Sequence, residues 1–370
     1  MRDLWWRLPG PSRFVAKVGE SLRDGRSIVL CLPDFFPHGF VGALRAILPD
    51  AMQDQWHRLE LDSNSDCAPI DLLYARFVPE CAPEELRNTA SLMMRDTFGG
   101  RIVWLNGMTL RAWPAWKRFL SEYEHACRTA SLLERTLFCV PLFGELGLDP
   151  PAEDVCLAQH CWRGAVDYTD ILLHSATAFQ SRGEKPLIKR VAIFIAAELA
   201  LWDPEVVERL AHVSIENILN PLEVLCRMAK DRGWSGSPIS YGEDAWRKGW
   251  SDLVEGRERL HSAALACSGR ADEIQRRIWS AEVSVMFPFV EEQRQNVLTR
   301  LTGFLQVPFR TRFGEVIDDV RDLEIGHIEA QLRRANPHAD SELLQLVQRL
   351  REARNRLAHR ETLPLELLTE

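Results

Sequence analysis

The sequence lacks a run of apolar residues long enough to cross a bilayer. The longest run, Val191 to Trp202, contains Glu198 and is shorter than the roughly 20 residues that a membrane-spanning helix needs. Met1–Trp6 contains charged residues with no apolar core after them, so we expect no signal peptide there. These absences predict a soluble, cytoplasmic protein without membrane contact.

Positive charge is also in short supply. The chain has 45 Lys and Arg residues against 53 Asp and Glu residues, which leaves a net charge of −8. This balance argues against a protein that binds nucleic acid mainly through charge, although it leaves room for RNA contact at one local basic site. The nine cysteines are scattered and odd in number, which fits a reducing compartment better than a disulfide framework.

Several catalytic motifs are missing from the sequence. It contains no Gly-x-Ser-x-Gly nucleophile elbow, no HExxH zinc helix, no Gly-rich nucleotide fingerprint and no internal repeat. Cys156, His160 and Cys161 form the one close group of Cys and His, and their spacing fits no standard zinc pattern. We therefore expect neither a metal nor a cofactor, and we find no catalytic set for a small-molecule enzyme.

The first 165 residues have the pattern of an α/β domain. Short continuous apolar runs are typical of buried parallel strands. The expected strands are 27–32, 56–61, 101–105, 136–140 and 155–161. Helices are expected between them, including Pro11–Arg23, Phe40–Ile47 and a segment that contains Trp113 and Trp116. Strands that alternate with helices predict a mostly parallel sheet that is covered on both faces.

The remaining residues have a helical pattern in three regions. Residues 166–235 are expected to form a helical extension, and 236–271 a linker with a docking helix. Trp246 and Trp250 lie one turn apart in that helix and either dock it onto the body or form a partner-binding patch. Residues 272–370 carry long amphipathic patterns with short breaks, which predicts a C-terminal helical bundle in which Pro288 kinks or restarts one helix.

The last long helix, expected over 341–360, carries the strongest functional signal. Its expected N-cap is Asp340 or Ser341, after a turn at 336–338. The apolar stripe places Arg354 where a leucine is expected. Because an arginine in such a seam costs free energy unless it is paired, we expect Arg354 to face a partner charge or a phosphate. The residues that form this stripe are Leu343, Val347, Leu350 and Leu357.

The end of this helix resembles a known family. The segment that carries the resemblance is Arg354-Asn355-Arg356-Leu357-Ala358-His359. It is similar to the HEPN domain (higher eukaryotes and prokaryotes nucleotide-binding), and the likeness covers roughly the last 100 residues. The resemblance implies that two such helices meet across a homodimer and form a metal-independent ribonuclease site. Arg354 and His359 would then be catalytic, with Asn355 supporting them.

The chemistry of such a site is sound in principle. A histidine can move the proton of an attacking ribose 2′-hydroxyl, and an arginine can stabilise the charge that grows on the phosphate. Many members of the family nevertheless keep this signature as non-catalytic dimer or scaffold domains. Glu324 and His327, one turn apart on the preceding helix, are expected to be a surface pair. Both alternatives, active and inactive, stay open at this point.

The layout of the first 165 residues is similar to P-loop NTPase domains of the AAA or STAND kind. The loop after strand 27–32 lacks the Gly-Lys-Ser/Thr that wraps phosphates, and strand 101–105 ends in Asn106 and Gly107 instead of an acidic pair. ATP hydrolysis is therefore not expected. In the same loop, Asp34 is interpreted as a turn-stabilising residue in preference to an acid/base partner of His38.

Taken together, these resemblances predict a component of a bacterial conflict system such as antiphage defence. We expect a non-catalytic or weakly catalytic adaptor that binds protein partners of the same gene cluster. The alternative is a ribonuclease effector that cuts RNA at the C-terminal helix of a homodimer. An ion pair that locks Arg354 inside one bundle would favour the adaptor, and an open cleft shared with His359 would favour the ribonuclease.

Overall fold

The computed structural model describes residues 2–61, 67–80, 87–131, 134–234, 236, 239–311, 313–335 and 341–368. The chain divides into two compact units, one of residues 1–170 and 238–261 and the other of residues 171–237 and 262–370. The expected turn at 336–338 and the expected cap Asp340 lie outside the described residues. No helix among the described residues is both long and apolar enough to span a bilayer.

The first unit is built on a five-stranded parallel sheet with the order β2-β3-β4-β1-β5. The expected mostly parallel α/β sheet is thus confirmed. The interior strand β1 is buried at every position, as its continuous apolar run predicts, and pairs with β4 on one side and β5 on the other. The strands are β1 (Ser27–Leu32), β2 (Trp56–Glu60), β3 (Ile102–Asn106), β4 (Leu137–Phe143) and β5 (Leu157–Cys161).

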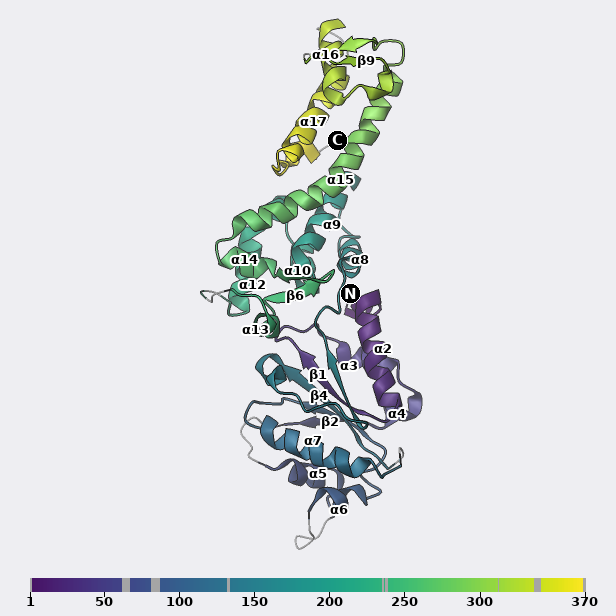
Figure 1. The fold of residues 1–370 in the computed structure, drawn as a ribbon, viewed down its shortest axis with the longest axis vertical. Helices are drawn as coiled ribbons and strands as arrows, with labels where there is room; N and C mark the ends of the chain where they lie inside the picture. Colours follow the sequence, from purple (N-terminus) through teal and green to yellow (C-terminus); the bar gives the residue numbers. More distant parts are fainter. Residues whose placement is uncertain are drawn as a thin grey trace. The chain divides into compact units, whose positions relative to one another are not determined.

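Helices cover both faces of this sheet. Figure 1 shows α2 (Pro9–Arg23) and α3 (Phe40–Ala46) on one side, and α5 (Pro69–Phe77), α6 (Thr89–Met93) and α7 (Trp113–Cys127) on the other. One hydrophobic core lies under α5 and α7, where aromatic rings surround Phe138 of β4. Further short helices of this unit are α1 (Arg2–Trp5), α4 (Asp50–Asp54) and η1 (Gly144–Leu148).

Residues 238–261 belong to the first unit. They form α13 (Glu243–Arg247) and an antiparallel hairpin of β6 (Ser251–Val254) and β7 (Arg257–Leu260). The buried Asp252 carboxylate accepts hydrogen bonds from the backbone N–H of Gly164 at 2.8 Å and of Leu253 at 2.7 Å. Trp246 and Trp250 are both buried, so these rings serve packing and form no exposed patch.

The second unit is helical. Two of its helices matter most here, α15 (Ala271–Arg300) and α17 (Ser341–Ala358). Pro288 was expected to kink or restart this helix. The helix does not restart, because α15 continues through Pro288, but Figure 1 shows it bending along its length. The other helices after residue 166 are α8 (Tyr168–Ala178), α9 (Pro186–Ala200), α10 (Pro204–Ala211), α11 (Ile215–Leu219), α12 (Leu222–Asp231), α14 (Ser262–Cys267), α16 (Ile325–Ala335) and α18 (Leu365–Leu368).

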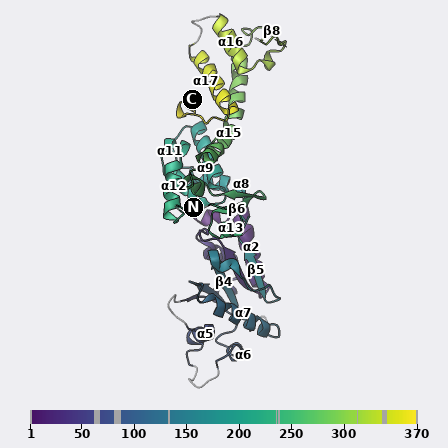
Figure 2. The ribbon, with the colours of Figure 1, turned by 60° about the vertical axis from the view of Figure 1, so that its left-hand side comes forward.

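Helix α15 contributes to two packed groups of helices. It contacts α9 and α14 as well as α17, and α16 packs on α17 in turn. Figure 2 shows α16 and α17 beside the later part of α15. A core of aliphatic side chains joins these three helices and includes Val290, Val297, Ile328, Val347 and Leu350. Between α15 and α16 lie β8 (Phe309–Arg310), β9 (Val316–Ile317) and η2 (Val320–Asp322).

Candidate functional site on the last long helix

Helix α17 buries a stripe that differs by one residue from the expected one. Ala353 is 1% exposed and completes the stripe, whereas the Arg354 side chain is 41% exposed. The prediction that Arg354 occupies the apolar seam was therefore wrong. Spacings of four, three, three and four residues keep the apolar face turned to one side, and this places Arg354 at its edge. The buried residues of the stripe are Leu343, Val347, Leu350, Ala353 and Leu357.

Arg354 forms an ion pair within its own unit. Its Nη2 lies 3.1 Å from a carboxylate oxygen of Glu324, just before α16. The two side chains line a surface concavity of about 500 Å³. The charged residues around it balance, with three arginines against three acids. They are Arg294, Arg321, Arg354, Glu291, Asp322 and Glu324.

A second arginine that lines this concavity is itself held in place. Arg294 donates to the Glu291 carboxylate at 2.7 Å and to the backbone carbonyl groups of Arg321 and Leu323. The hydrogen bonds from Arg294 and Gln295 lower the pKa of the Glu291 carboxyl to about 2. The arginines and acids around the concavity are equal in number, so it presents no excess of positive charge to a phosphate.

Asn355 and His359 line a second, separate concavity of about 430 Å³. The backbone N–H of His359 donates to the carbonyl of Asn355 at 3.0 Å, so Asn355 lies in the last turn of α17 and His359 directly follows the helix. Nearby, the nearly buried Glu329 pairs with Arg351 at 2.7 Å and with Arg333 at 2.6 Å. This second concavity is therefore neutralised by its own acids as well.

The helix period explains why the expected site does not assemble within one chain. Positions 354 and 359 are five residues apart, which is roughly 140° around an α-helix. Asn355 and His359 face one concavity, and Arg354 faces another. Within one chain the structure thus brings together two of the three predicted residues and leaves Arg354 with Glu324 instead.

The expected pair Glu324 and His327 is arranged differently from a carboxylate–imidazole pair. The backbone N–H of Glu324 lies 3.2 Å from Nδ1 of His327, so the imidazole accepts a hydrogen bond at the start of α16. The ring also lies 5.4 Å from the ring of Phe309. His327 therefore shapes the segment that presents Glu324 to Arg354.

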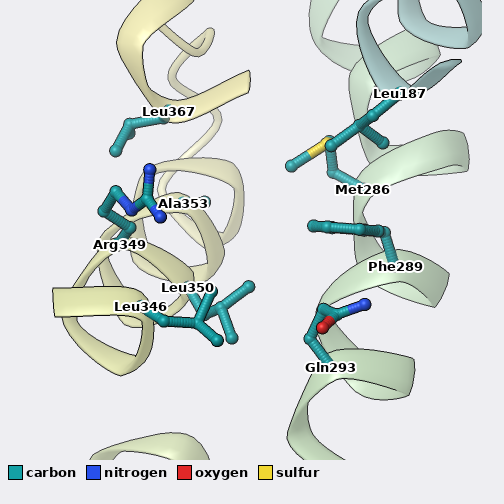
Figure 3. Close-up of a pocket in the computed structure, with 9 residues that line it drawn as sticks. All are labelled: Leu187, Met286, Phe289, Gln293, Leu346, Arg349, Leu350, Ala353 and Leu367. Carbon is teal, nitrogen blue, oxygen red and sulfur yellow. The ribbon is translucent and has the colours of Figure 1, made fainter. Parts of the chain in front are cut away.

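Helix α17 also borders a pocket that the sequence did not reveal. This pocket of about 300 Å³ lies between α17 and α15. In Figure 3 the side chains of Met286, Phe289 and Gln293 lie on one wall, and those of Leu346 and Arg349 lie on the other. Leu187 of α9 and Leu367 of α18 complete the lining. Because it depends on segments far apart in the sequence, helical periodicity alone could not find it.

In the first unit, residues of the loop after β1 form hydrogen bonds and contacts with other residues of the same unit. The backbone N–H of Asp34 donates to the carbonyl of Arg247 at 2.8 Å, and its carboxyl lies against Gly144, where no side chain would fit. Burial and the nearby Glu145 raise the pKa of the Asp34 carboxyl. His38 contributes its carbonyl, which accepts a hydrogen bond from Trp6 Nε1 at 2.8 Å.

The Cys156, His160 and Cys161 group is likewise built into the sheet. His160 Nε2 lies 3.0 Å from Ser21 Oγ, and Cys161 is the register partner of Cys31 on β1. Burial lowers the pKa of His160 to about 4. Within the described part of the chain, no group of three or more His, Cys, Asp or Glu side chains is placed to hold a metal ion.

Comparison with known proteins adds no assignment to this geometry. No protein-family model matches the sequence, and no curated protein is detectably similar to it.

Proposed function

We propose that this protein is a non-catalytic adaptor in a bacterial conflict system such as antiphage defence, and that it binds protein partners of the same gene cluster. The observation that carries this proposal is the ion pair between Arg354 and Glu324 inside one chain. In the HEPN resemblance the arginine is the residue that stabilises the phosphate. Here the guanidinium of that arginine already pairs with an acid.

Electrostatics supports the inactive form of the motif. An exposed ion pair stabilises a protein by only about 0–1 kcal/mol, so RNA could break the contact itself at little cost. The Glu324 carboxylate would still remain near the phosphate and repel it, as would Glu291 and Asp322 in the same concavity. A catalytic arginine needs the opposite environment, in which donors point toward the developing negative charge.

The α/β unit supports the same proposal. The loop after β1 carries an acid and prolines where phosphate binding needs a lysine and several backbone donors. The backbone N–H of Asp34, which starts this loop, is already bonded to Arg247. We propose that this sheet serves as a scaffold for partners and that the chain does not hydrolyse nucleoside triphosphates.

An RNA cleavage assay tests the proposal directly. Total RNA and a defined RNA hairpin, incubated with the purified full chain, should stay intact, and Arg354→Ala and His359→Ala should behave like the parent chain. Arg356→Ala is the matched control, since Arg356 is a partly exposed, ion-paired arginine of the same helix. Cleavage by the parent chain that is lost in the first two variants and kept in the control would instead establish the ribonuclease.

A binding measurement tests the adaptor role itself. Co-expression with the products of the adjoining genes should yield a stable complex of defined stoichiometry in size-exclusion chromatography with light scattering. The expected complex should form equally well with Arg354→Ala and His359→Ala, because the proposal gives these residues no catalytic role. Failure to form a complex with any of those gene products would contradict the proposal.

A further inference from the structure

An aromatic cleft of about 320 Å³ opens in the first unit at the carboxyl end of the sheet. Five aromatic side chains line it and define what we call the aromatic cleft. They are Phe36, Phe40, Trp56, Trp104 and Phe143. The cleft involves only residues of the α/β unit, so it is independent of the motif on α17 and of the adaptor proposal.

Sheet topology explains why a cleft forms there. The connection after β1 leads to β2 at one edge of the sheet, whereas the connection after the neighbouring β4 leads to β5 at the other edge. Where the connections of adjacent parallel strands diverge, their carboxyl ends leave a crevice, and such crevices are the usual ligand sites of open α/β sheets. Leu32, at the end of β1, and Phe143, at the end of β4, both line the cleft.

The rings that line the cleft have two orientations, and two of them, Phe40 and Trp104, are almost fully buried. Trp56 and Trp104, on neighbouring strands, are stacked with centroids 6.1 Å apart and an interplanar angle of 23°. Phe36 stands near both Phe40 and Phe143, with centroids 5.6 and 6.5 Å away and steep interplanar angles. Phe143 is 40% exposed although it ends a buried strand, so core packing does not account for this ring.

Polar groups at the rim indicate which rings would fit. Asn106 donates to the Glu60 carboxylate at 2.6 Å, and Arg58 forms an ion pair with the same carboxylate. Of these groups, Arg58 and Asn106 line the cleft with Asp34, whereas the Glu60 carboxylate is occupied by the first two. Arg58 and Asp34 contribute one positive and one negative charge, so the lining offers no excess of positive charge to phosphates. The Asp34 carboxyl can accept hydrogen bonds from donors such as amino groups on a ring.

We propose that the aromatic cleft binds a planar nitrogen heterocycle, namely a nucleobase or a nucleoside without phosphates. Every nucleobase has a π face that stacks on aromatic side chains, and its edge amino groups can donate to the Asp34 carboxyl that lines the cleft. The volume lies at the low end of the range for small-molecule sites, which suits a single ring system with its sugar better than a peptide segment.

A fluorescent base analogue tests this inference. 2-Aminopurine riboside, titrated with the full chain, should be quenched with saturation at one site per chain, because its emission falls when it stacks on an indole. Phe143→Ala should weaken binding by about tenfold, the loss expected when one stacking ring is removed. Phe304→Ala is the matched control, since Phe304 is 39% exposed and lies in the second unit. Binding by this control should equal that of the parent chain.

Competition defines the ligand class. Adenosine should displace the probe, and ATP should displace it less well because the cleft offers its phosphates no excess of positive charge. The inference is overturned if the parent chain gives no saturable quenching at millimolar probe. It is equally overturned if Phe143→Ala binds as well as the control, or if ATP binds more tightly than adenosine. Melting curves of both variants show whether each remains folded.

Discussion

Replacing Arg232 with alanine is expected to lower the free energy of unfolding of the helical unit by about 3–5 kcal/mol. Arg232 follows α12, and its side chain is only 5% exposed. Its guanidinium lies 2.6 Å from Asp203 and 2.5 Å from Glu205, both at the start of α10, and its Cζ lies 5.1 Å from the ring of Trp234. Removing it would leave the buried carboxylate of Asp203 without this cation.

Urea denaturation followed by circular dichroism measures this effect, and two further variants isolate its cause. Arg227→Ala removes an exposed, ion-paired arginine from the same helix and should cost less than about 1 kcal/mol. Adding Asp203→Asn to Arg232→Ala should recover part of the lost stability, because it removes the buried charge. Equal losses for the alanine variants at 232 and 227 would refute the explanation.

Replacing Glu282 with glutamine is expected to remove a pH-dependent loss of stability that reaches about 4 kcal/mol in the parent chain. Glu282 is fully buried on α15, and its Oε2 accepts a hydrogen bond from the backbone N–H of Leu363 at 3.0 Å. Burial raises the pKa of its carboxyl from 4.5 to about 8. The folded chain therefore keeps a proton that the unfolded chain releases, and stability falls as pH rises from about 4.5 to about 8.

Unfolding free energies of the parent chain and of Glu282→Gln, measured in urea from pH 5 to pH 9, test this expectation. The two should be nearly equal at pH 5, and the variant should be more stable at pH 9. Only their difference is diagnostic, because burial also raises the pKa of Glu124 to about 8 and of Asp252 to about 7. Glu292→Gln, at an exposed position of the same helix, controls for the loss of one carboxylate. A difference that does not change with pH would show that Glu282 is ionised throughout.

The sheet could be predicted from the sequence because its strands are short, apolar and buried. The prediction stopped β4 at Val140, and the next residue, Pro141, has no N–H to donate. The strand in fact continues to Phe143. Its pairing with β3 ends at Cys139, so Pro141 lies beyond the point where that neighbour needs a donor. The residue at which a strand stops pairing depends on the neighbouring strand, so it cannot be predicted from the sequence of one strand alone.

The hairpin and the site geometry escaped prediction for similar reasons. The turn between β6 and β7 places Glu255 and Gly256 at positive φ, which a two-residue hairpin turn requires, but only its glycine signals this in the sequence. On α17 the period identified the helix and four of its buried residues. The helical period could not decide which of Ala353 and Arg354 is buried, because that depends on where α15 and α16 lie.

The length of α15 has a consequence for dissecting the helical unit. This single helix of 30 residues supplies packing surface to α9 and α14 and also to α17. A fragment that ends before Ala271 would leave the apolar side of α9 uncovered. A fragment that begins at Ile325 would lack the α15 side chains that pack against α17. Neither half should be soluble as an isolated fragment, so deletion mapping of a partner should use substitutions in the intact chain instead of truncations.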